Sequence, residues 1–139
     1  MKFSTRNQLK GTVSSLTEGV INSEVTISLS DGVEIVSVIT NGAVKNLDLK
    51  VGSIAYAFIK ASNVIIGVGE AKVSARNVLS GTVSAVIEGS VNDEVAIELG
   101  SGLTLTAVIT KSSVSKLELA VGMEVSAIIK ASAVILAVD

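Results

Sequence analysis

The feature that most constrains this chain is an internal duplication. Residues 2–68 of the 139-residue sequence return without a gap as residues 72–138, and about half of the paired positions are identical. Two copies are too few for a stacked repeat array, so the duplication predicts two tandem domains. We expect domain 1 at 1–68, a linker at 69–72 and domain 2 at 73–139, and so short a linker would hold the two domains close together.

Each copy has the pattern of short strands. In the first, Val25, Ile27 and Leu29 alternate with Thr26 and Ser28, which is typical of a half-buried strand. The expected strands are 9–17, 21–29, 33–39, 53–59 and 63–68, and then 79–87, 91–99, 103–109, 123–129 and 133–138.

Turns and caps complete the pattern. Gly32 allows a tight turn at 30–32, and Thr40 and Thr110 can each cap a short helix, the first over 41–47. Five strands with a helix between the third and fourth is the order of an OB-type barrel. The expected fold is therefore all-β, with two tandem OB-type five-stranded barrels that each carry one short helical turn. A sandwich is the alternative.

Composition excludes several classes of function. The absence of Cys and His leaves no thiolate or imidazole for a metal site, a nucleophile or a general base. A net charge of −2 and only three aromatic residues argue against a nucleic-acid partner, which needs concentrated cations and stacking platforms. No nucleophile–base pair or phosphate loop is present, so we expect no enzymatic activity.

The expected location is the cytoplasm. The sequence shows no secretory signal pattern and no apolar run near the roughly 20 residues that a membrane-spanning helix needs, so we expect no membrane partner. Apolar residues make up 48% of the chain, more than two small barrels need for their cores. We attribute the excess to subunit contacts and expect a homo-oligomer.

Two duplicated polar clusters are the candidate binding residues. The first cluster has the pattern Ser-x-Arg-Asn and the second the pattern Lys-Ala-Ser. Cationic side chains, hydroxyls and an amide are the donors that a small oxyanion needs, and Arg offers a fixed fork of N–H groups. Each cluster alone is better explained as a solvated turn, but the retention of both in both copies favours binding. The candidate oxyanion-binding residues are Ser4, Arg6, Asn7, Lys60, Ser62, Ser74, Arg76, Asn77, Lys130 and Ser132.

Other polar groups have simpler interpretations. The segments 19–22 and 89–92 are typical of hairpin turns, and we interpret Glu24, Glu94 and Glu98 as solvated strand faces. The run 110–113 is rich in hydroxyls, which favours helix capping, with a secondary anion site at that helix start as the alternative.

The order and spacing of these motifs resemble the molbindin (Mop) family, the molybdate-binding form of the transport-associated OB domain. The resemblance covers nearly the whole chain twice, so the sequence is similar to a tandem (di-Mop) molbindin. It is carried by Ser74-Ala75-Arg76-Asn77, Leu79-x-Gly81-Thr82-Val83, Gly89-x-Val91-Asn92-x-Glu94-Val95, Val108-Ile109-Thr110 and Lys130-Ala131-Ser132-x-Val134-Ile135-Leu136.

The resemblance implies binding of molybdate, and of tungstate, between subunits. In that family the Ser-Ala-Arg-Asn turn of one unit combines with the Lys-Ala-Ser turn of another, and six Mop units surround a threefold axis, which implies a trimer here. Two departures occur: Thr5 stands opposite Ala75, which ligation through backbone N–H tolerates, and Ala133 stands opposite Asn63, which places that position in doubt as a ligand.

The expected function is therefore intracellular storage or homeostasis of molybdenum as molybdate. The alternative is an OB-type adaptor or ligand-sensing module that acts through a partner protein, such as a regulator or a transporter component.

Overall fold

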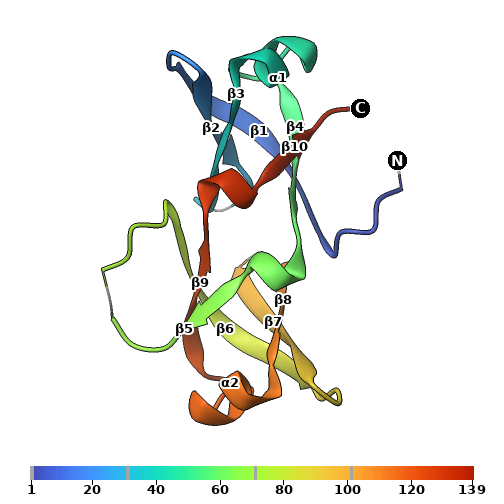
Figure 1. Cartoon of the computed structure of the whole chain (residues 1–139), viewed down its shortest axis with the longest axis vertical. Coiled ribbons are helices and arrows are strands. Elements are labelled where there is room, and N and C mark those ends of the chain that lie inside the picture. Colours follow the sequence, from blue (N-terminus) through green and yellow to red (C-terminus); the bar gives the residue numbers. More distant parts are fainter. Residues whose placement is uncertain (1, 31, 71, 101) are drawn as a thin grey trace. The chain divides into compact units, whose positions relative to one another are not determined.

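The chain forms two compact units, which are described separately (Figure 1). The computed structural model describes residues 2–30, 32–70, 72–100 and 102–139. Unit 1 contains the residues up to Ile59 together with Lys130–Asp139, and unit 2 contains Lys60–Ile129. The chain therefore passes from unit 1 to unit 2 after Ile59 and returns after Ile129.

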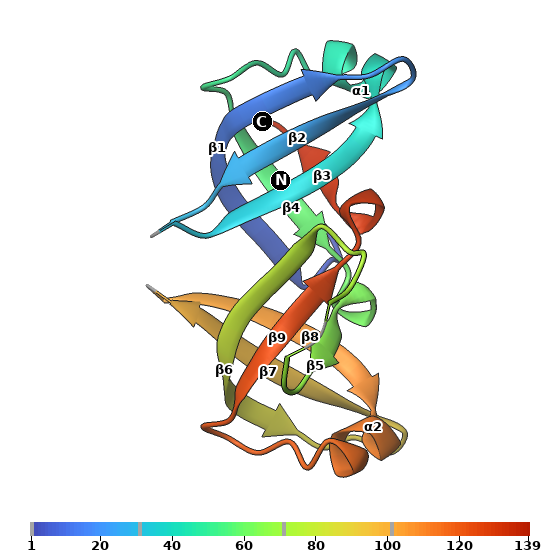
Figure 2. The same ribbon diagram turned by 90° about the vertical axis from the view of Figure 1, so that its left-hand side faces the viewer.

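Unit 1 is an OB-type barrel of five strands. Its elements are β1 (Asn7–Glu18), β2 (Asn22–Ser28), β3 (Glu34–Thr40), helix α1 (Asn41–Asn46), β4 (Ile54–Ile59), the 3-10 turn η2 (Ala131–Ala133) and β10 (Ile135–Ala137). All the strand pairs are antiparallel, in the order β10-β4-β1-β2-β3. β3 also contacts η2 and β10, so the two edges of the strongly curved sheet approach each other (Figure 2).

Unit 2 repeats this plan. Its elements are η1 (Ala61–Asn63), β5 (Ile65–Gly67), β6 (Asn77–Ile87), β7 (Asn92–Gly100), β8 (Leu103–Thr110), helix α2 (Lys111–Lys116) and β9 (Glu124–Ile129). The strand order is β5-β9-β6-β7-β8, and β8 contacts η1 and β5. The all-β, tandem OB-type fold that the sequence predicts is thus confirmed.

The compact units do not coincide with the sequence repeats. The first repeat was expected to close on itself at residue 68, but β5 pairs with β9 and β10 pairs with β4, so each repeat gives its last strand to the other unit. The segment 69–72, expected as a linker between domains, joins β5 to β6 within unit 2. One residue of that segment, Ala71, lies outside the described residues.

The exchanged segments are part of the cores. Val134 and Leu136 are buried in unit 1, and the fully buried Ser37 hydroxyl donates a hydrogen bond to the Val134 carbonyl at 2.7 Å. Val64 and Ile66 hold the equivalent positions in unit 2 and are also buried. Each barrel is therefore complete only with residues from both repeats.

The rest of the core is formed by apolar residues that alternate with polar ones along the strands. Val25, Ile27 and Ile35 are completely buried, while Thr26, between the two β2 residues, is only partly covered. β1 approaches β2 so closely that a Cβ on Gly11 would lie 2.5 Å from the Ser28 carbonyl oxygen. This contact explains a glycine inside a strand, where the residue otherwise weakens the structure.

Strand bounds differ from expectation mainly at the exchanged segments. The expected strands 63–68 and 133–138 are shorter, because η1 and η2 occupy the positions that follow each lysine. The helix expected at 41–47 is present at Asn41–Asn46, and the Thr40 hydroxyl accepts from the Ala43 N–H at 3.1 Å as its cap. The turn expected at 30–32 includes Asp31, which lies outside the described residues.

Candidate functional site

The Ser-x-Arg-Asn segments lead into the first strand of each unit. Ser4 and Arg6 are exposed, whereas Asn7 is buried and pairs in register with Ile59, the last residue of β4. The Asn7 side-chain Nδ2 donates to the Ile59 carbonyl at 3.1 Å. Asn7 therefore anchors the segment to the end of β4.

The second copy is placed in the same way. Ser74 and Arg76 are exposed, while Asn77 is 2% exposed and pairs in register with Ile129, the last residue of β9. In both copies the serine and arginine are exposed and precede the strand, and the asparagine is the first residue of the strand.

The Lys-Ala-Ser turns are 3-10 helices rather than hairpin turns. Lys60 and Lys130 precede η1 and η2 with extended backbone, and Ser62 and Ser132 are exposed. The alanine between them is buried in both copies, so the turn rests on the barrel by its apolar residue and leaves the ammonium and hydroxyl outside. Lys60 and Lys130 form no ion pair with any residue in the described ranges.

Strand register brings the two clusters to the same end of each barrel. In unit 1, Asn7 and Ile135 lie on opposite sides of β4, paired with Ile59 and Phe58. The residues before each of them, 3–6 and 130–134, therefore extend beyond the end of β4, opposite the end where α1 lies. Adjacent strands lie about 4.8 Å apart, so the strand ends from which these two segments extend lie about 10 Å apart on either side of β4.

Unit 2 shows the same juxtaposition. Asn77 and Ile65 flank the end of β9, so residues 73–76 and 60–64 extend beyond it. Each unit thus combines the Ser-x-Arg-Asn segment of one repeat with the Lys-Ala-Ser turn of the other. Unit 1 contains Ser4, Arg6, Asn7, Lys130 and Ser132, and unit 2 contains Ser74, Arg76, Asn77, Lys60 and Ser62.

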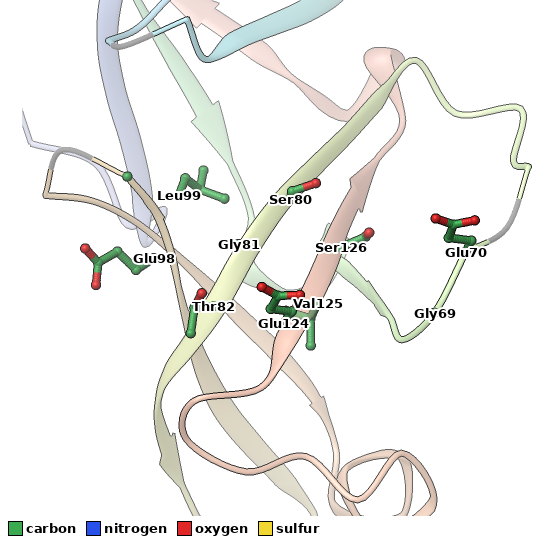
Figure 3. A pocket seen from close by; sticks show the side chains of 11 residues that line it. Gly69, Glu70, Ser80, Gly81, Thr82, Glu98, Leu99, Glu124, Val125 and Ser126 are labelled. Atoms are coloured by element: carbon green, nitrogen blue, oxygen red, sulfur yellow. The ribbon is translucent and has the colours of Figure 1, made fainter.

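A cavity of about 800 Å³ lies elsewhere in unit 2 (Figure 3). Among its lining side chains are three carboxylates, Glu70, Glu98 and Glu124, and it contains none of the candidate residues. Carboxylates repel an oxyanion, so this cavity is a poor anion site. In the described part of the chain no group of three or more acidic side chains is placed to hold a metal ion.

The hydroxyl-rich residues at the start of α2 cap the helix. The Thr110 hydroxyl accepts from the Ser113 N–H at 3.1 Å, which is the capping that the sequence favoured. Lys111 lies 3.4 Å from the buried Asp93 carboxylate, which also accepts from the Gly89 N–H at 3.0 Å. With its lysine engaged by a carboxylate, this corner offers an anion little positive charge.

Sequence reasoning missed the exchange of the terminal strands. The sequence carries one signal of this exchange: neither Lys-Ala-Ser turn contains the glycine or asparagine that a two-residue hairpin needs. It also missed the contacts of Phe3, Thr5 and Gln8, which are polar or aromatic only in the first copy. No helix in the described ranges is long and apolar enough to cross a membrane.

Known proteins resemble the chain along its whole length. Residues 4–66 and 73–136 each match the TOBE domain. The chain is 42% identical over 139 residues to the molybdenum-pterin-binding protein MopA of Rhodobacter capsulatus, a match that covers 99% of this chain and 52% of MopA. It is 40% identical over 141 residues to the molybdenum transport protein ModE of Herbaspirillum seropedicae, with 100% and 52% covered. The chain thus spans about half the length of these curated relatives.

A solved structure matches the whole molecule. The crystal structure of the cytoplasmic molybdate-binding protein ModG with molybdate bound superposes with a TM-score of 0.96, at 42% identity and with all of both chains covered. This agreement extends to the fold of both units and to their order in the chain. With two copies of the matching domain over most of its length, the chain belongs to the TOBE domain family, in the tandem form that its resemblance to the di-Mop molbindins predicted.

Proposed function

We propose that this protein binds molybdate reversibly at its Ser-x-Arg-Asn and Lys-Ala-Ser clusters and performs no chemistry on it. The observation that carries the proposal is that strand register positions the two clusters on either side of the same strand end in each barrel. The full-length similarity to ModG, whose structure holds molybdate, supports the choice of ligand.

The donors suit a tetrahedral dianion. The ammonium of Lys130, the guanidinium of Arg6 and nearby hydroxyls supply charge and hydrogen bonds without a metal, and charge-assisted bonds of this kind are about twice as strong as neutral ones. Tungstate has the same charge and shape, so we propose that it binds as well. Sulfate carries equal charge but is smaller, so selectivity would come from the size of a rigid cage.

We further propose that the sites are completed between subunits of a trimer with six Mop units. Large apolar side chains are exposed in both units, among them Val20, Ile21 and Val51, and Val20 is 97% exposed. Exposed apolar surface of this kind marks contact sites. A ligand held by two subunits also stabilises their association by mass action.

The physiological role that we propose is storage and homeostasis of molybdenum in the cytoplasm. A second role is favoured by one observation: the chain spans about half of MopA and of ModE. A tandem pair of this kind can act as the ligand-sensing part of a longer protein or of a complex with a regulator or transporter component. Both roles require the same binding step.

Isothermal titration with molybdate tests the binding step. We expect Arg76→Ala to weaken molybdate binding at the unit 2 site and Lys130→Ala at the unit 1 site, each by about ten- to a hundredfold while the other site of the chain is kept, since each removes a charge-assisted contact of about 1.5–3 kcal/mol. Lys116→Ala is the matched control, because Lys116 is an exposed lysine in the last turn of α2, away from both clusters. If both variants keep two sites of wild-type affinity, with the fold intact by circular dichroism, the assignment of the sites is wrong.

A further inference from the structure

The Ser-x-Arg-Asn segment of the first copy is held in place by contacts of its neighbouring side chains. We call residues 3–8 the first site segment and residues 73–78 the second site segment. The Thr5 hydroxyl donates to the Ile59 carbonyl at 3.0 Å in a partly buried bond. This bond fixes the residue between Ser4 and Arg6 to the end of β4.

Two further side chains hold the same segment. The Gln8 amide Nε2 donates to the Thr5 carbonyl at 3.0 Å and to the Phe3 carbonyl at 3.2 Å. The Phe3 ring lies 4.8 Å, between centroids, from the ring of Phe58, which is buried in β4. The first site segment is thus tied at its beginning, its middle and its end.

The second site segment lacks the groups for all of these contacts. Its corresponding residues are Val73, Ala75 and Val78, and Ile128 stands where the first copy has Phe58. None of these side chains has a hydroxyl, an amide or an aromatic ring. The difference is therefore fixed by side-chain chemistry, although the two segments share Ser, Arg and Asn.

A segment that is already ordered binds its ligand at a lower entropic cost. When only a fraction of molecules holds the binding conformation, the apparent dissociation constant rises by the inverse of that fraction. On the basis of the proposed function, we propose that the two sites of one chain are not equivalent. The site on the first site segment binds the oxyanion more tightly, because Phe3, Thr5 and Gln8 act as positioning residues.

Single-site variants make the difference measurable with molybdate as the probe. Arg76→Ala leaves the site on the first segment, and Arg6→Ala leaves the site on the second. We expect molybdate to bind about tenfold more tightly to the Arg76→Ala protein than to the Arg6→Ala protein, which corresponds to about 1.4 kcal/mol. Equal dissociation constants in the two proteins would overturn the inference.

Substitutions at Thr5 test the cause in the Arg76→Ala background. Thr5→Val removes the hydroxyl at nearly constant shape and should weaken molybdate binding about three- to fivefold, while Thr5→Ser should restore it. Ser15→Ala is the control, because Ser15 is an exposed β1 residue that the second copy replaces by Ala85. If Thr5→Val lowers the thermal midpoint but leaves the affinity unchanged, Thr5 is merely structural and the inference fails.

Hydrogen exchange of the ligand-free protein gives a readout that is independent of molybdate. The amide protons of residues 4–7 should exchange about three- to tenfold more slowly than those of 74–77, and Thr5→Val should remove most of the difference. Equal rates in the wild-type protein would overturn the positioning argument. If the wild-type protein and both arginine variants fail to bind molybdate, the proposed function itself fails. If the two variants bind molybdate with equal, measurable affinities, only the present inference fails.

Discussion

Ser37→Ala tests whether the C-terminal segment belongs to the core of unit 1. The Ser37 hydroxyl is fully buried in β3 and donates to the carbonyl of Val134, which is 1% exposed and lies ninety-seven residues away in sequence. Removal of the hydroxyl leaves that carbonyl buried without this donor. The cost of such an unsatisfied group is about 1–3 kcal/mol.

The structure contains its own comparison for this substitution. Unit 2 has Ala107 at the corresponding position, also completely buried, so alanine is compatible with the barrel and the loss in unit 1 should reflect the hydrogen bond alone. Ser14→Ala is the matched control. Its hydroxyl also donates to a strand carbonyl, that of Thr26 at 3.3 Å, but at an exposed position where water can replace it.

Native-state hydrogen exchange is the assay, because it reports the units separately. In Ser37→Ala, the amides of β3 and β10 should lose protection that corresponds to about 1–3 kcal/mol, while β6 to β9 should keep theirs. Thermal unfolding of unit 1 should shift down by at least about 4 °C, since about 1 kcal/mol moves the midpoint of a small domain by that much or more. If Ser37→Ala behaves like Ser14→Ala, the exchanged C-terminal segment is not the core element described above.

Two other predictions concern packing and ionisation. Gly11→Ala should destabilise unit 1 by about 1–3 kcal/mol in denaturant unfolding, because its Cβ would lie 2.5 Å from the Ser28 carbonyl oxygen. Gly42→Ala, whose Cβ has no neighbour nearer than 3.9 Å, should be neutral or stabilising, and equal effects of the two substitutions would contradict the close approach of β1 to β2. The hydrogen bond from the Tyr56 hydroxyl to Asp139 raises the pKa of Tyr56, the only tyrosine, above its ordinary value. Asp139→Asn should therefore move the ultraviolet titration of Tyr56 to lower pH, and an unchanged titration would refute that contact.

The sequence was sufficient to predict the barrels but not how the strands are divided between them. Alternation in β2 and the Thr40 cap are local signals, and both elements formed where they were expected. The last strands, in contrast, begin at Ile65 and Ile135, and each is preceded by a valine, Val64 or Val134. Either strand therefore fits beside β4 or β9, and local pattern alone does not distinguish the two pairings.

The site shows a similar division. Residue types and duplication select the two polar clusters as candidates, and their role in binding stays a prediction. The bond from Thr5 to the Ile59 carbonyl was not predictable, because Thr5 was noted only as a departure from the alanine of the second copy. Its effect depends on a backbone acceptor that strand register brings near, and register is a tertiary property.

Native mass spectrometry with and without molybdate, in competition with excess sulfate, tests whether molybdate occupies both clusters. We expect a species of three times the 14.1-kDa chain mass that gains molybdate at micromolar concentration and keeps it against sulfate. We also expect Arg6→Ala combined with Arg76→Ala to lower the molybdate content. No uptake of molybdate by the wild-type protein at micromolar concentration would refute molybdate binding at these clusters.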